Sequence, residues 1–222
     1  EYLRPASSAI RELAPMATFY ADGRRVKVDE IDVGNRTRRL IESWRMCPAC
    51  NHMERQFTAA VVEQCPVCGS GDWKDVGQGR KLVHFRLSRS LESGLVAATA
   101  DVGEDRERVA YDVRELIDVE RGALDGARAV RDLPFGLERL RGAVLREVNF
   151  GPRGSGMDVG ADAVQVGGEQ VDSGGFVVCG DCGRVRMPRE DRQAEIHHAP
   201  TCRTRRNLSA EVERLFLYRE VT

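Results

Sequence analysis

The sequence has no long apolar segment. No run of apolar residues approaches the roughly 20 needed to cross a bilayer, and the chain does not open with the basic, apolar and small-residue regions of a signal peptide. We therefore expect a cytoplasmic protein without a membrane partner. Because the chain starts at Glu1 and not at methionine, we also expect it to be a domain of a longer polypeptide.

Sequence motifs of catalysis are also missing. There is no glycine-rich phosphate loop with its lysine and hydroxyl residue, no G-x-S-x-G elbow, no H-E-x-x-H helix and no zinc-deaminase signature. This predicts a non-catalytic chain without a small-molecule substrate. A nucleophilic pair of Cys179 and His197 stays open as the basis of a redox or hydrolytic enzyme, but each cysteine is better explained as a metal ligand.

Lysine is scarce, since only Lys27, Lys74 and Lys81 occur and the other basic residues are arginines. The formal net charge of −1 argues against a uniformly basic nucleic-acid sleeve. The excess of arginine has two explanations, a GC-rich genome or phosphate recognition by planar guanidinium groups.

All of the cysteines belong to two clusters. The odd total of seven and the C-x2-C spacing favour thiolate coordination in a reducing compartment over disulfides. The first cluster has the pattern C-x2-C-x14-C-x2-C, whose four sulfurs suit a closed structural zinc site, with iron as the alternative. Its predicted ligands are Cys47, Cys50, Cys65 and Cys68.

The second cluster offers Cys179, Cys182 and Cys202 with a histidine as the fourth ligand. His198 is preferred, because its three-residue gap to Cys202 is typical of zinc fingers, while His197 stays an alternative. Another alternative is three buried cysteines with unrelated histidines. The sequence thus predicts two Zn²⁺ ions as cofactors.

Arginines surround the second cluster, and they predict either contacts with DNA phosphates or a solvated face balanced by acidic residues. The candidate DNA contacts are Arg184, Arg186, Arg203, Arg205 and Arg206, with Arg189 and Arg192 nearby.

The predicted fold class is α+β, built mostly of small β elements, with two zinc-stapled lobes and a mixed α/β middle. The expected divisions are a β-hairpin with a four-cysteine zinc ribbon (1–87), a mixed segment (88–150), a glycine-rich linker (151–175) and a zinc site of three cysteines and one histidine with a C-terminal helix and the start of a strand (176–222).

Local patterns predict individual elements within these divisions. They indicate a short helix before Pro15, a hairpin turning at 21–24, and strands over 82–87 and 108–113. Helical spacing links Leu137, Leu140, Val144 and Leu145, and also Leu208, Val212, Leu215 and Phe216, for which we expect a helix beginning near Ser209.

Several segments carry a resemblance to a known family. They are 13–15, 21–24, the Cys47–Cys68 ribbon, 146–151, 175–183, the His198–Cys202 pair and 217–222. Together they resemble the zinc-binding region of large bacterial DEAD/DEAH-box (superfamily 2) helicases. That region leads into the C-terminal domain of unknown function shared with mitomycin-repair-type helicases and with DISARM and Druantia anti-phage proteins.

The resemblance implies an accessory domain of an ATP-driven DNA helicase or translocase in anti-phage defence or DNA repair. Its partners would be DNA and motor domains in the same or another protein, and ATP with Mg²⁺ would act only in those motor domains. The alternative is a zinc-ribbon adaptor that docks a partner subunit of a defence complex through an apolar patch near Phe216 and Tyr218.

Overall fold

The computed structural model describes residues 2–35, 37–56, 62–75, 79–90, 93–95, 109–119, 122–153, 164–171, 173–187, 196–203 and 212–221. In these ranges the protein consists mostly of short β-strands with one α-helix, α1 (Ala6–Glu12), and one 3-10 helix, η1 (Gly71–Lys74). This agrees with the predicted class of small β elements. Among the same residues, no helix has the length and apolar character that spanning a bilayer requires.

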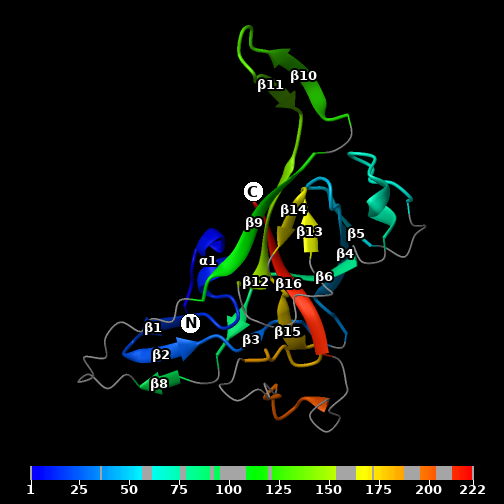
Figure 1. The fold of residues 1–222 in the computed structure, drawn as a ribbon. Coiled ribbons are helices and arrows are strands. Elements are labelled where there is room, and N and C mark those ends of the chain that lie inside the picture. The colour runs from blue at the N-terminus through cyan, green and yellow to red at the C-terminus, as the bar shows by residue number, and fades with distance from the viewer. Residues whose placement is uncertain are drawn as a thin grey trace.

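A seven-stranded sheet forms the centre of the molecule (Figure 1). Its strands are β4 (Ile41–Met46), β5 (Met53–Arg55), β6 (Gly79–His84), β9 (Tyr111–Asp118), β12 (Val144–Pro152), β15 (Phe176–Cys179) and β16 (Val212–Val221). The order along the sheet is β5-β4-β6-β16-β12-β9, and β15 also pairs with β16. Strand β16 is parallel to β6 and antiparallel to β12 and β15. Segments that are far apart in the sequence therefore share one sheet.

The C-terminal segment is a strand, so the helix predicted there is wrong over residues 212–216. Leu215 and Leu217 are buried with one core cluster, whereas Phe216 and Tyr218 are buried with another. A strand covered on both faces gives a continuous apolar run, and such a run also contains residues at helical spacing. Leu208 and Ser209 lie outside the described residues.

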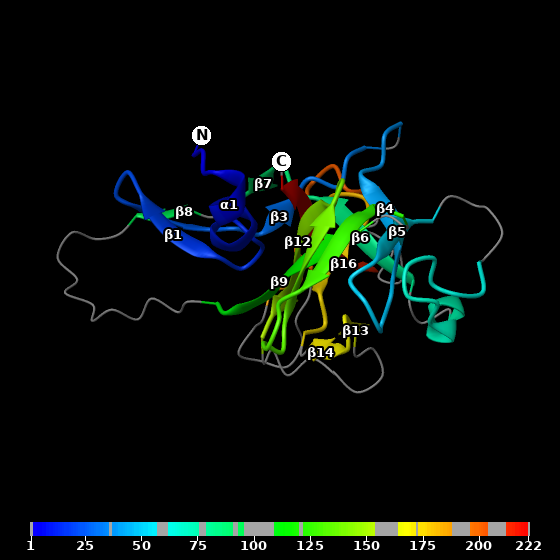
Figure 2. The same ribbon diagram turned by 90° about the horizontal axis from the view of Figure 1, so that it is seen from above.

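Each face of the sheet has its own apolar core. Trp44, Leu82, Phe150 and Phe216 belong to the first core, together with valines of the hairpin formed by β13 (Val164–Val166) and β14 (Glu169–Val171). The second core contains Ile10 of α1 and is completed by Ile31, Phe176, Leu215 and others. Figure 2 accordingly shows α1 and the β13–β14 hairpin on opposite sides of the sheet.

The N-terminal predictions for a short helix and a hairpin are confirmed. Helix α1 ends at Glu12, before Pro15, and β1 (Thr18–Ala21) pairs with β2 (Arg24–Lys27) through a turn at Asp22-Gly23. Both turn residues have positive φ, 51° and 68°, as tight hairpin turns require. Two short strand pairs complete this region: β2 pairs with β8 (Ser93–Leu95), and β3 (Glu30–Ile31) pairs with β7 (Ser88–Arg89).

The middle of the chain contains strands where the helical spacing of apolar residues suggested a helix. Leu137 and Leu140 lie in β11 (Gly136–Leu140), which pairs with β10 (Leu124–Ala129), and Val144 and Leu145 begin β12. Leu137 and Leu140 do not pack into a core, since they are 67% and 37% exposed. Helical spacing of apolar residues indicates a helix only where these residues pack against a core, and the two leucines do not.

Candidate metal centres

The first cysteine cluster lies beside the β5 edge of the sheet. Cys47 follows directly after β4, Cys50 lies in the turn before β5, and Cys65 and Cys68 belong to the loop that leads to η1. Cys47, Cys65 and Trp73 of η1 form a small buried core of their own. The cluster is thus fixed both by the sheet and by one tryptophan.

Sulfur–sulfur distances at the first cluster fit one tetrahedral ion. The four Sγ atoms lie within 4.8 Å of one another, with 3.6 Å between Cys47 and Cys68 and 3.7 Å between Cys50 and Cys65. Zn–S bonds of about 2.3 Å at tetrahedral angles place two sulfurs about 3.8 Å apart, whereas a disulfide would bring them to about 2.05 Å. The arrangement suits metal coordination and excludes disulfides in this structure.

Backbone N–H groups support these sulfurs. Burial raises the pKa of the Cys47 thiol to about 11, although the N–H groups of Ala49 and Cys50 act in the opposite direction. At the exposed Cys68, burial also acts to raise the pKa, but the N–H of Ser70 and the neighbouring cysteines lower it to about 7. The thiolate forms of such cysteines are stabilised by a bound cation, and binding the cation releases the thiol protons.

The second cluster forms where β15 ends. The N–H of Gly183 donates to the carbonyl of Cys179 at 2.8 Å and closes the turn that holds Cys182. Cys202 lies 3.7 Å from Cys179 (Sγ to Sγ) and 3.4 Å from His198 Nδ1. The distance from Cys182 Sγ to His198 Nδ1 is 3.8 Å. These values lie within about 0.2 Å of the roughly 3.6 to 3.8 Å edges of a tetrahedral site with three sulfur ligands and one nitrogen ligand.

His198, and not His197, offers its ring nitrogen to this second group of ligand atoms. Asp181 lies in the Cys179–Cys182 turn and links it to the segment that carries His198 and Cys202. Its carboxylate accepts a hydrogen bond from the N–H of Arg203 at 3.0 Å and lies 3.5 Å from Cys202 Sγ. Burial raises the pKa of the Cys182 thiol to about 12. All eight predicted ligands are therefore gathered into two groups that could each hold a metal ion.

The arginines predicted to contact DNA differ in where the structure places them. Arg184 is only 4% exposed, and its guanidinium pairs with Asp29 and Glu30. It is therefore a structural residue and not part of a surface that DNA could reach. Arg186 is half-buried and Arg203 is exposed. Arg189, Arg192, Arg205 and Arg206 lie outside the described residues.

The apolar patch expected for an adaptor is not found near Phe216 and Tyr218, because both side chains are buried, at 3% and 1% exposure. Large exposed apolar side chains occur at several other places, such as Leu3 at 80% exposure, and three of them, Leu133, Phe135 and Leu137 at 52%, 56% and 67%, lie on and near the β10–β11 hairpin.

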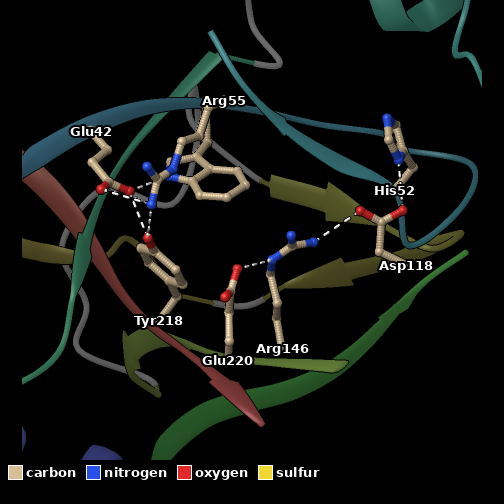
Figure 3. A network of polar contacts seen from close by, with 8 residues as sticks. Glu42, His52, Arg55, Asp118, Arg146, Tyr218 and Glu220 are labelled. Atoms are coloured by element: carbon tan, nitrogen blue, oxygen red, sulfur yellow. Dashed lines mark hydrogen bonds and ion pairs between the residues drawn. The ribbon is translucent and has the colours of Figure 1, made fainter. Parts of the chain in front are cut away.

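A network of polar contacts that the sequence did not reveal involves five strands and consists of two groups, whose arginines Arg55 and Arg146 both lie over the ring of Trp44 (Figure 3). At one end, the Tyr218 hydroxyl donates to Glu42 at 2.6 Å, and Arg55 contacts both residues, at 2.9 Å from Tyr218 and 3.0 Å from Glu42. Burial, together with the hydrogen bond to Glu42, raises the pKa of Tyr218 to about 12. The hydroxyl therefore stays protonated and acts as a donor.

At the other end, Arg146 pairs with Asp118 at 2.9 Å and with Glu220 at 3.3 Å. Asp118 in turn lies 2.7 Å from Nδ1 of His52, whose ring is packed 5.3 Å from the ring of Trp73. These partners are distant in the sequence, so no local motif could have identified them. The network ties the sheet to the tryptophan that supports the first cluster.

No family model, curated protein or solved structure matches this chain.

Proposed function

We propose that the chain binds two Zn²⁺ ions as structural centres and carries out no reaction at them. The observation that supports this is the pair of four-ligand groups with near-tetrahedral spacing, one of four cysteines and one of three cysteines and a histidine. Four protein ligands leave no open coordination position for water or substrate, which is the arrangement of structural zinc sites. Iron remains the competing ion for the four-sulfur group.

We further propose that this zinc-stabilised domain is an accessory part of an ATP-dependent DNA helicase or translocase in defence or repair, with the ATPase in separate motor domains. The support is the resemblance in the cysteine pairs and flanking segments, together with the exposed guanidinium of Arg203 beside the second cluster. Backbone phosphates are the ligands that such a residue would meet.

Binding to labelled single- and double-stranded DNA over a salt series tests the DNA role. Arg203→Glu should weaken binding and flatten the salt dependence, because each phosphate contact contributes about one unit to the slope. Arg24→Glu provides the matched control, since Arg24 is also an exposed arginine and lies in β2. Binding that is absent at low salt, or that does not respond to salt, would contradict the proposal.

A further inference from the structure

The β10–β11 hairpin is an arm that extends beyond the central sheet. Strands β9 and β12 pair antiparallel as far as Asp118 and Val144, and residues 124–140, between them in the sequence, contain a separate two-stranded ribbon. Figure 1 shows this ribbon projecting away from the rest of the molecule. Residues 125–129 and 131–142 are all exposed. Because an isolated two-stranded ribbon is only marginally stable, a bound partner would stabilise it.

The strand register assigns different side chains to the two faces of the arm. Arg128 is opposite Leu137, Arg139 is opposite Gly126, and the N–H of Val130 donates to the carbonyl of Phe135. Residues directly opposite each other share a face, and so do residues two apart along a strand. One face, called the arginine face here, consists of Arg128, Val130, Phe135, Leu137 and Arg139. The other face carries Ala127, Ala129, Gly136, Glu138 and Leu140.

Charged side chains lie on both faces of the arm and at both of its ends. Of the carboxylates in the described ribbon, Glu138 lies on the opposite face, Asp125 lies at the base where the strand register shifts, and Asp132 lies in the turn between the strands. Asp125 lies 3.4 Å from Arg139 and 2.8 Å from Arg141, so it offsets part of the charge there. The arginine face therefore combines guanidinium groups with exposed apolar side chains.

These side-chain types match the edges of base pairs in the DNA major groove. Arginine binds guanine O6 and N7 with two hydrogen bonds, and apolar side chains contact the thymine methyl group. The groove is about 12 Å wide and admits a two-stranded β-ribbon. Strand β10 is about 20 Å long, and the small residues Ala127, Ala129 and Gly136 keep the ribbon thin.

We propose that the β10–β11 arm inserts its arginine face into the major groove of duplex DNA. This inference rests on the proposed DNA-binding function and names the element that makes the groove contact. The arginines on the same face as Phe135 and Leu137 favour a polyanionic partner over a protein with an apolar surface.

An arm-deletion variant tests the inference in the full chain. Since Val144 pairs directly with Asp118, residues 119–143 can be replaced by Asn-Gly, which favours a two-residue hairpin turn. The variant should keep two metal ions and its melting temperature, yet bind duplex DNA roughly tenfold or more weakly, as the loss of one or two base-edge contacts would cause. Binding is measured by fluorescence anisotropy at fixed low salt.

Point variants and modified DNA distinguish the faces and the grooves. Arg128→Gln with Leu137→Gln should weaken binding, whereas the opposite-face pair Ala127→Ser with Leu140→Gln should leave binding unchanged. A duplex whose major groove is filled by glucosylated hydroxymethylcytosine should bind the intact protein as weakly as an unmodified duplex binds the deletion variant. Netropsin, which fills the minor groove, should not compete.

The possible outcomes separate the inference from the proposed function. If the deletion variant binds duplex DNA as tightly as the intact protein while Arg203→Glu still weakens binding, the inference is overturned and the DNA-binding function stands. If the intact protein binds no DNA at low salt, both fail. If the deletion changes only the molar mass in solution and not the DNA affinity, the arm is a protein-docking element and the inference is overturned.

Discussion

The guanidinium of Arg184 lies 2.6 Å from the carboxylate of Asp29, which is 155 residues earlier in the chain. Arg184 follows the second cysteine turn directly, and the N–H of Ile31 donates to the carbonyl of Gly183 at 3.0 Å. The second metal cluster is thus attached to the N-terminal segment by an ion pair and by backbone hydrogen bonds.

Replacing Arg184 with methionine should destabilise the protein by about 2 to 4 kcal/mol, because Asp29 and Glu30 would keep their charge in a largely buried place without this partner. Arg89, which lies 2.8 Å from Glu30, compensates for part of the loss. Urea unfolding measures the change. Arg203→Met is the control and should change stability by less than about 0.5 kcal/mol, as is usual for exposed side chains. Equal effects of the two changes would contradict the structural role of Arg184.

Gly183 and Gly69 form a matched pair of turn glycines. Each follows the second cysteine of a C-x2-C turn and has positive φ, +73° and +77°. A Cβ at Gly183 would lie 2.0 Å from the carbonyl oxygen of Ile31, whereas a Cβ at Gly69 meets nothing within 4 Å.

Gly69→Ala should therefore cost about 1 to 2 kcal/mol from backbone strain alone. Gly183→Ala should cost clearly more, because the backbone of Ile31 must also move. Thermal unfolding of both variants with metal bound compares their stabilities. A Gly69 variant that is less stable than the Gly183 variant would contradict the close packing of Gly183 against the carbonyl group of Ile31.

Asp118 makes stability depend on pH. Burial opposes ionisation, but the hydrogen bonds and charges of His52 and Arg146 hold the pKa of Asp118 below its usual value. A carboxyl group with a lowered folded-state pKa stabilises the protein above the unfolded value of about 3.9, and this contribution is lost as pH falls through the folded-state pKa.

Asp118→Asn should thus lower the free energy of unfolding by about 2 kcal/mol at pH 5, and this loss relative to the unchanged protein should shrink near pH 4 and below. Urea unfolding at each pH measures it. Asp125→Asn, which removes an ion-paired carboxylate from the exposed arm, should cost under about 1 kcal/mol. A loss of stability on Asp118→Asn that grows as the pH falls from 5 to 3 would contradict the assignment.

Cys47→Ser should remove one metal ion and unfold the region around the first cluster, because site binding energy on the order of 10 kcal/mol is also folding energy. Val67→Ser is the control in the same cluster, since Val67 lies between Cys65 and Cys68 without being a ligand and is 36% exposed. Metal content and melting temperature are measured for both. A Cys47→Ser variant that keeps both would mean that the first site is misassigned.

The metal ligands could be predicted because C-x2-C spacing is visible in four consecutive residues, and the turn that these residues form is enough to bring both sulfurs together. A single turn brings Cys179 and Cys182 together, and the structure confirms this grouping and adds His198 and Cys202. The N-terminal hairpin was predictable for the same reason, since Asp22 and Gly23 are residue types that adopt the positive φ of a two-residue hairpin turn.

The sheet could not be predicted, because its order depends on pairings between distant segments. The run from Leu215 to Tyr218 is a strand only because β6 and β12 lie on its two sides and a core covers each face. The network of Glu42, Arg55, Asp118 and Arg146 depends on the same long-range pairing. Arg184 looked like a surface cation in the sequence, and only its contacts with Asp29 and Glu30 reveal that it is internal.

Metal content per chain tests the central claim most directly. The protein is purified without added metal and analysed by inductively coupled plasma mass spectrometry, with its thiols titrated before and after addition of a strong chelator. The account predicts two zinc ions per chain and seven thiols that react with an alkylating reagent only after chelation. A chain that is folded without metal, with thiols that react freely or are paired as disulfides, would contradict it.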